Sequence, residues 1–312
     1  MPRQALRYLL ALLLIATLNF LIPRLMPGDP LANLLGEEAE LSGEQIARLR
    51  AELGLDLPLG RQYLRYWRAL GLLDFGYSYH SGRPVLALVA ERAGWTLLLV
   101  GPAVLLGAVA GALLGAAAGW RPQRIGNRAA TAAALAVYAM PPYFLALLLL
   151  YLFSFVLGLF PLKGYYGQGG AADVVRHLTL PVLVLSLFTT SRNFVVMRGS
   201  VLQEKQRHYA SFAAAKGLTG RQVLYRHVFR NASLPLLTVL ALDFGFILSG
   251  ALFVEIAFSL NGMGTLIYEA VRARDYPVLQ GAFLLVTLMV VGANLLVDLL
   301  YAVIDPRPKA AA

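Results

Sequence analysis

Apolar runs long enough to cross a lipid bilayer dominate the sequence. Hydrophobic residues make up 58% of the 312 positions and charged residues only 14%, whereas about 25% of a typical soluble domain is charged. A membrane-spanning helix needs roughly 20 consecutive apolar residues. Six runs approach or exceed that length, at residues 6–26, 95–119, 130–157, 178–198, 236–256 and 281–303. The sequence therefore predicts an all-α, polytopic membrane protein in which residues 1–312 form one transmembrane domain with six transmembrane helices.

The first apolar run follows Arg3 and Arg7 and could be a signal peptide or a transmembrane helix. No small-residue cleavage site follows the run, and Pro23 and Pro27 lie at its end. A secretory signal peptide ends in such a site. We therefore expect a first transmembrane helix with its N-terminus in the cytoplasm.

Residues 27–94 differ in kind from the apolar runs. They hold nine acidic and seven basic residues, so we expect a folded, water-facing extracytoplasmic insert after the first helix. Ser42 and Gln45 indicate a capping box that opens a helix through about Leu53. Residues 59–70, with two Tyr and one Trp, are typical of an interfacial helix. A simple linker is the alternative.

Glycines and prolines mark where the predicted membrane helices pack and bend. Gly101, Gly107, Gly111 and Gly115 recur along the second run, and the last three form two overlapping GxxxG units. Such units permit close contact between helices in a membrane. Pro141–Pro142 and Pro181 should kink or break the third and fourth spans, because proline removes a backbone donor and clashes with the preceding turn.

A polar segment, residues 204–235, separates two of the apolar runs. Good helix formers at 208–216 are followed by Gly217, which is suited to a left-handed helix end. Thr219 can cap a second helix, with Gln222 as its capping-box partner, and that helix should run to about residue 231. We expect a helical hairpin outside the lipid.

The first helix of this hairpin offers one stripe of side chains spaced at i, i+3, i+4 and i+7. The stripe consists of Tyr209, Phe212, Ala213 and Lys216, and it is small and apolar at its centre. Such a face suits insertion into a groove of another protein. The basic side chains of the second helix, Arg221, Arg226 and Arg230, could face the same partner or anionic lipid headgroups.

Lys and Arg residues set the expected orientation. Fifteen of them fall in the N-terminal segment, the loop 121–128, the stretch 192–230 and the C-terminal tail, against two carboxylates. The positive-inside rule therefore places both termini and the polar segment 204–235 in the cytoplasm. Since the net charge of +10 follows this membrane asymmetry, the sequence disfavours a nucleic-acid-binding role.

Several motifs resemble one family of membrane subunits of ABC importers, the dipeptide/oligopeptide/nickel permeases. They are MPGDP at 26–30, AAAKGL at 213–218, RHVFRNASLP at 226–235, RARDYPVLQG at 272–281 and NLLVDLLYAVIDPR at 294–307. The chain departs from the family pattern at His208, Ala214, Leu260 and Asn261. These departures weaken any transfer of fine specificity.

The resemblance implies a type I ABC importer permease that forms half of a translocation pathway for peptides. Residues 204–235 would be the cytoplasmic EAA-type loop, whose first helix couples to an ATPase subunit through Tyr209, Phe212, Ala213, Ala214, Lys216 and Gly217. Implied partners are a homologous second permease, two ATPase subunits or domains, and an extracytoplasmic solute-binding protein. The expected location is a bacterial or archaeal cytoplasmic membrane. Nickel chelates and glutathione-like compounds are alternative substrates within the family.

The chain carries no visible enzymatic chemistry. It has no cysteine, its four histidines are scattered, and the phosphate-binding motif GxxxxGK[ST] is absent. We expect no cofactor or metal on this chain, with ATP and Mg²⁺ bound by the partner ATPases. An intramembrane hydrolase lacks a nucleophile here, and an ion-coupled secondary transporter is the alternative transport mechanism.

Three carboxylates lie within the last two predicted spans. Asp243 is well inside its span, while Glu255 and Asp298 lie nearer to helix ends. Carboxylates in a membrane are energetically costly and usually face a pathway or a partner. Asp243 could line the translocation pathway, or serve as the coupling site of a secondary transporter, or make a polar contact between helices. The other two are expected to be structural.

Overall fold

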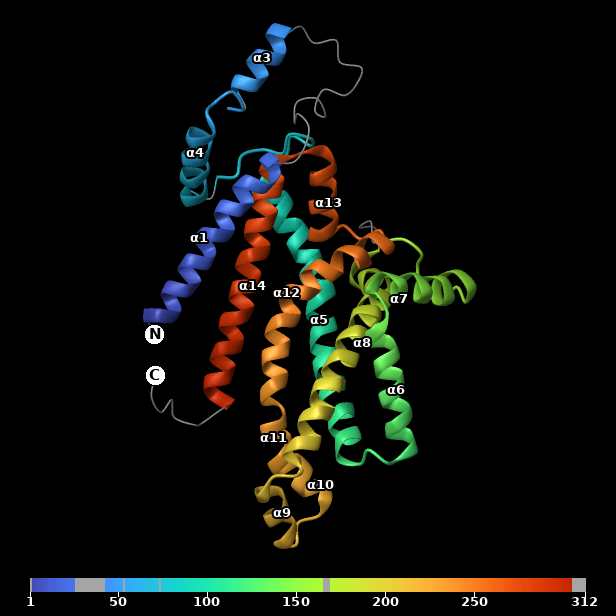
Figure 1. The fold of residues 1–312 in the computed structure, drawn as a ribbon. Helices are drawn as coiled ribbons and strands as arrows, with labels where there is room; N and C mark the ends of the chain where they lie inside the picture. The colour runs from blue at the N-terminus through green and yellow to red at the C-terminus, as the bar shows by residue number, and fades with distance from the viewer. Residues whose placement is uncertain (1, 26–42, 53, 73, 165–168, 305–312) are drawn as a thin grey trace. The chain divides into compact units, whose positions relative to one another are not determined.

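Every regular element in the described part of the chain is a helix (Figure 1). The computed structural model describes residues 2–25, 43–52, 54–72, 74–164 and 169–304. The chain divides into two compact units: residues 1–95 with 262–291, and residues 96–261 with 292–312. The predicted all-α class is confirmed.

The first unit contains two helices of the predicted insert, and one of them, α4, packs against α1. Its elements are α1 (Pro2–Leu25), α3 (Gly43–Glu52), α4 (Leu59–Leu72), α13 (Met263–Ala273), the start of α5 (Val85–Trp120) and most of α14 (Tyr276–Ile304). Helices α3 and α4 lie where the sequence predicts helices. Residues 27–42 of the insert lie outside the described residues, and α5 begins at Val85 rather than at 95.

Aromatic side chains fasten α4 to α1. Phe20 and Tyr66 are buried in one cluster, with ring centroids 5.6 Å apart. The Thr17 hydroxyl lies 2.9 Å from the hydroxyl of Tyr63. The rings supply apolar contacts and the tyrosine hydroxyl supplies a polar contact. Together these contacts hold the amphipathic helix α4 against the end of α1.

A second core in this unit joins the start of α5 to α13 and α14. Its buried members include Val85, Val89, Met263 and Leu279. Gly281 on α14 lies so close to α5 that a Cβ there would approach a methyl of Val85 to 2.7 Å. The turn between α13 and α14 contains Arg274 in a left-handed conformation, φ 54°.

The second unit is built on long helices that run beside one another (Figure 1). They are the rest of α5, α6 (Ile125–Ala139), α8 (Gly170–Glu204) and α12 (Leu234–Ala257), with shorter elements α7 (Pro142–Leu149), η1 (Leu150–Val156), α9 (His208–Ala215), α10 (Gly220–Val223), η2 (Leu224–Val228) and α11 (Phe229–Ala232). Helices α9 to α11 lie at one end of α8 and α12. Val104, Val184, Ala251 and Val254 are buried in the core that α5, α8 and α12 share.

Glycines let α5 and α8 approach closely. A Cβ at Gly107 would fall on Thr189, a Cβ at Gly111 would come within 2.6 Å of the Asn193 Cβ, and the predicted third site, Gly115, meets the backbone of α8 in the same way. The predicted helix contact through the GxxxG units is confirmed. Gly119, one turn further along α5, extends the contact, whereas Gly101 has open space around it.

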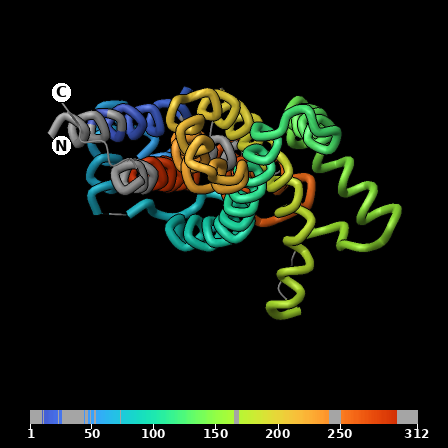
Figure 2. The backbone as a smooth tube through the Cα atoms, turned by 90° about the horizontal axis from the view of Figure 1, so that it is seen from below, coloured from blue at the N-terminus to red at the C-terminus, as the bar shows by residue number. Residues whose placement is uncertain are grey.

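The two predicted proline sites behave differently. Helix α6 and the α7–η1 pair are bent by 107° where they meet at Pro141–Pro142, and Figure 2 shows the α7–η1 arm turned away from α6. This break is as predicted. Pro181 lies inside α8, which continues through it.

Three described helices are long and apolar enough to cross a membrane. They are Val85–Trp120, Gly170–Glu204 and Tyr276–Leu295, and the bent pair from Ile125 to Val156 would make a fourth. In α1 the apolar stretch is shorter, Leu12–Ile22. Helix α12 occupies the predicted fifth span, but the side chains of 241–250 lie outside those described. A multi-pass membrane protein is supported, and the count of six spans stays a prediction.

Candidate functional site

The polar segment forms the compact helical hairpin that the sequence predicts. Helix α9 ends at Ala215, with the amide of Lys216 donating to the Phe212 carbonyl at 3.1 Å. Gly217 follows with φ +85°, a left-handed conformation that a side chain would strain. The chain therefore turns sharply at Gly217 for a local reason.

The second half of the hairpin starts at the predicted capping box. The Gln222 amide donates to the Thr219 hydroxyl at 3.4 Å, and the Thr219 amide donates to the Gln222 side-chain oxygen at 2.8 Å. The helix then runs through α10, η2 and α11 to Ala232. Its middle turn is π-helical, a widening that sequence analysis did not predict.

The hairpin has a small hydrophobic core of its own. Ala210 and Ala213 of α9 are buried with Val223, Leu224 and Val228 of the second helix, and Ala116, Met197, Val201 and Ala232 complete the cluster. Because alanines occupy the α9 side of this core, the two helices can pack closely on the ends of α5 and α8. The hairpin is thereby fixed to the ends of the long helices.

This burial divides the predicted docking stripe between two faces. Ala213 is only 6% exposed and points into the core of the chain, while Tyr209 is half-buried. Phe212 is 63% exposed, Lys216 is exposed one turn further on, and Ala214 is exposed on a different side of the helix. The Lys216 ammonium lies 4.6 Å from the centre of the Phe212 ring, a cation–π contact that keeps the ring on the surface. Among the predicted coupling residues of this helix, Phe212 and Lys216 therefore form one exposed side of α9, and Ala214 is exposed on another.

Polar contacts tie the hairpin to α5 and α8. The Tyr209 hydroxyl donates to Glu204 Oε2 at 2.5 Å, and the Lys205 ammonium donates to the Trp120 carbonyl at 2.8 Å while lying 4.8 Å from the centre of its ring. Burial, reinforced by the bond to Glu204, raises the pKa of Tyr209, so its hydroxyl remains a donor at neutral pH. Movement of the hairpin would therefore displace the ends of α5 and α8.

The basic side chains of the second helix face solvent. Arg221, Arg226 and Arg230 are all exposed, and the exposed ring of Tyr225 lies beside that of Phe229 at 5.9 Å between centroids. This surface remains open to either a protein partner or lipid headgroups.

The predicted pathway carboxylate cannot be placed by its contacts. Asp243 lies in α12, and Asp298 in α14, but both side chains lie outside the described residues. Glu255 is fully buried and accepts a hydrogen bond from the Thr96 hydroxyl at 2.7 Å. This contact between α12 and α5 fits the structural role expected for Glu255, and sequence analysis did not identify Thr96.

A buried carboxylate that sequence analysis did not single out organises the first unit. Asp275 accepts hydrogen bonds at one oxygen from the Ser78 hydroxyl, at 2.5 Å, and from the His80 amide, at 3.1 Å. Its other oxygen accepts from the Val278 amide at the start of α14, at 3.4 Å. Asp275 lies in the motif RARDYPVLQG, which was the available signal. It fastens the loop before α5 to the beginning of α14.

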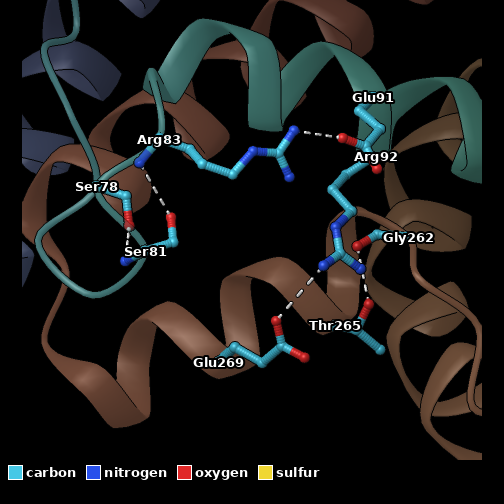
Figure 3. A network of polar contacts seen from close by, with 8 residues as sticks. All are labelled: Ser78, Ser81, Arg83, Glu91, Arg92, Gly262, Thr265 and Glu269. Atoms are coloured by element: carbon cyan, nitrogen blue, oxygen red, sulfur yellow. Dashed lines mark hydrogen bonds and ion pairs between the residues drawn. The ribbon is translucent and has the colours of Figure 1, made fainter.

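Ion pairs surround this junction (Figure 3). Arg83 pairs with Glu91 at 2.8 Å, and Arg92 on α5 lies 3.9 Å from Glu269 on α13. The Thr265 hydroxyl near Arg92 donates to the Gly262 carbonyl at 2.9 Å. The start of α5 and helix α13 are thus joined by charge as well as by apolar packing.

Comparison with known proteins identifies the family. The model described as binding-protein-dependent transport system inner membrane component matches residues 107–310, and the model of its N-terminal region matches residues 1–100. The chain belongs to this permease family. The permease is 35% identical to the dipeptide transport system permease protein DppB of Escherichia coli K12, over 94% of this chain and 93% of that protein. It is 34% identical to a probable peptide ABC transporter permease of Sinorhizobium fredii, over 92% of each chain.

Family membership favours a transport subunit over an enzyme and favours an ABC permease over the ion-coupled alternative. The hairpin of α9 to α11 is part of the family's matched region, which also includes the long helices that hold it. The permease has its most exposed aromatic of this region, Phe212, on a helix rigidly attached to those long helices.

Proposed function

We propose that this permease forms half of the translocation pathway of an ATP-driven importer for peptides. The observation that carries the proposal is the match, over nine-tenths of both chains, to permeases named for peptide or dipeptide transport. Nickel chelates and glutathione-like compounds have no comparable support.

The proposed complex contains a second, homologous permease, two ATPase subunits or domains and an extracytoplasmic solute-binding protein. ATP and Mg²⁺ would bind to the ATPases, since this chain lacks the phosphate-binding motif. The charge distribution supports a cytoplasmic position for the hairpin and both termini. Asp243 remains the proposed pathway carboxylate.

The hairpin is proposed as the coupling element. Phe212, Ala214 and Lys216 would enter a groove on an ATPase, while Ala213 and the capped end at Gly217 hold the helix in shape. An exposed aromatic side chain flanked by a cation is typical of an anchor at a protein interface. Motion of the ATPase would then reach α5 and α8 through the contacts of Tyr209 and Lys205.

The test is ATP-dependent uptake of a radiolabelled dipeptide into proteoliposomes that contain the complete complex. Phe212→Asp should reduce uptake at least about tenfold, because a charge replaces an apolar anchor in a desolvated contact. ATP hydrolysis should no longer respond to the solute-binding protein. Uptake of the peptide by the unaltered complex without ATP, or normal coupling in the variant, would contradict the proposal.

Ile125→Asp is the matched control. Ile125 is 83% exposed in the other loop that is predicted to be cytoplasmic, so the substitution introduces the same charge in place of an exposed apolar side chain. We expect its uptake to stay within about twofold of the unaltered complex.

A further inference from the structure

A cavity of about 470 Å³ lies within the first unit, between the end of α1, helix α4, the loop that precedes α5 and the start of α14. Its size falls within the range of small-molecule sites, which is about 300–1,000 Å³. None of the coupling or pathway residues line it. The cavity is assembled by the predicted extracytoplasmic insert.

Two residues that line this cavity each carry a buried polar atom without a partner in the described structure. These atoms are the hydroxyl of Tyr66 and the amide nitrogen of Gln280. A buried donor that makes no hydrogen bond costs roughly 1–3 kcal/mol. Both residues lie on packed helices, α4 and α14, and a ligand whose acceptor oxygens reached these donors from the cavity would remove the cost.

Two arginines add positive charge to the same cavity. Arg24 is held on the ring of Phe20, 3.8 Å from its centre, and donates to the Gln62 side chain at 2.9 Å. Arg65 lies over the backbone of Gly54, where a Cβ would come within 2.5 Å of its terminal nitrogen. Gly54 has φ +67°, so a glycine at the end of α3 makes room for the guanidinium.

The hydroxyls that accompany these arginines are donors at neutral pH. Burial raises the pKa of Tyr66 to about 12, and burial together with the nearby Asp275 raises the pKa of Tyr79 to about 12. Arg24 opposes both shifts, which places its charge near both phenols. An incoming anion would therefore meet two guanidinium groups, two phenolic O–H groups and an amide N–H.

Asp74 supplies the opposite charge on the cavity wall. Its side chain accepts a hydrogen bond from the Gly76 amide at 3.1 Å and is exposed. The described ionisable groups of the lining are thus two arginines, one aspartate and three tyrosines. Because the lining carries both signs of charge, it suits a zwitterion with one anionic group and one ammonium group better than a polyanion. Arginine binds a carboxylate in a fork-like geometry, so a carboxylate is the expected anionic group.

We propose that this cavity binds a short peptide with a free carboxylate, which Arg24, Arg65, Tyr66 and Gln280 hold while Asp74 receives its amino group. The proposal rests on the proposed peptide transport and adds a site on the extracytoplasmic side. The cavity would receive the peptide after its release from the solute-binding protein and before its entry into the membrane pathway.

The experiment measures binding of radiolabelled dialanine, by equilibrium dialysis, to the permease–ATPase complex in phosphatidylcholine nanodiscs without the solute-binding protein. The unaltered complex should bind dialanine and should bind dialaninamide, which lacks the carboxylate, at least about tenfold more weakly. Equal binding of the two compounds, or no binding of dialanine, would overturn the proposal.

Two variants locate the binding to this cavity. Arg65→Gln should weaken binding of dialanine at least about tenfold. Arg68→Gln, at an exposed arginine of the same helix that does not line the cavity, should change it less than about twofold. Tyr66→Phe should weaken binding without lowering the melting temperature, because the hydroxyl has no partner in the described structure. Unchanged affinity in either cavity variant would overturn the assignment.

A lipid headgroup is the competing occupant. Mass spectrometry of phospholipid that co-purifies with the complex distinguishes it: loss of a bound phospholipid in Arg65→Gln with unchanged dialanine affinity would overturn the peptide site. Dipeptide uptake by the full complex separates the two proposals. Uptake without binding at the cavity would defeat only the site, and binding without uptake would defeat only the transport function.

Discussion

At the scale of single residues, neighbouring alanines in α9 have opposite environments. Ala213 is buried in the core of the hairpin, and Ala214 is exposed. Ala213→Trp would overpack that core and should destabilise the hairpin by about 1–3 kcal/mol or more. Ala214→Trp should cost less than about 0.5 kcal/mol in folding, yet it adds bulk to an exposed side of the helix that is proposed to enter the ATPase groove. Thermal unfolding of the purified permease measures the first effect.

Co-purification of the ATPase subunits measures the second effect. Ala214→Trp should release the ATPase or uncouple hydrolysis from transport while the permease keeps its melting temperature. Equal melting temperatures for both variants would show that Ala213 is not part of a packed core. Full ATPase retention and coupling in Ala214→Trp would remove this side of α9 from the proposed contact.

At the scale of elements, the pairing of α5 with α8 depends on glycines that have no room for a side chain. A Cβ at Gly111 would lie 2.6 Å from the Asn193 Cβ and 2.8 Å from the Thr190 carbonyl oxygen. Since the backbone of α8 cannot yield as a side chain would, Gly111→Ala should destabilise the helix pair by about 1–3 kcal/mol. The melting temperature of the detergent-purified protein should fall.

Gly101 provides a control on the same helix. Nothing lies within 4 Å of the position of its Cβ, and alanine has the higher helix propensity. Gly101→Ala should therefore leave the melting temperature unchanged or raise it. A similar loss of stability in both variants would mean that glycine in α5 serves the helix itself rather than the contact with α8.

At the scale of the whole molecule, the charge asymmetry predicts which segments face each side of the membrane. The chain has no cysteine, so single cysteines report without background. In intact cells Arg68→Cys, on the exposed face of α4, should react with an impermeant thiol reagent. Gln206→Cys, exposed before α9, should react only after permeabilisation. Labelling of Gln206→Cys from outside would reverse the orientation and exclude contact of the hairpin with a cytoplasmic ATPase.

The sequence by itself determined features whose causes lie within a few residues. Thr219 caps its helix because Gln222 stands three positions on, Gly217 takes the left-handed turn because it lacks a Cβ, and Pro141–Pro142 break a helix because proline cannot continue one. The spacing of Gly107, Gly111 and Gly115 likewise predicted a close contact between helices. Motifs such as AAAKGL at 213–218 and RHVFRNASLP at 226–235 were enough to indicate the family.

Only the tertiary structure decided which residues far apart in the sequence contact one another. Thr96 and Glu255 are 159 positions apart in the sequence, and Ser78 and Asp275 are 197 apart. The inward face of α9 depends on Met197 and Val201 of α8, so helical spacing could define the stripe but could not say that Ala213 is buried. The cavity of Arg24, Arg65 and Gln280 arises in the same way, because its walls come from segments that meet only after the chain has folded.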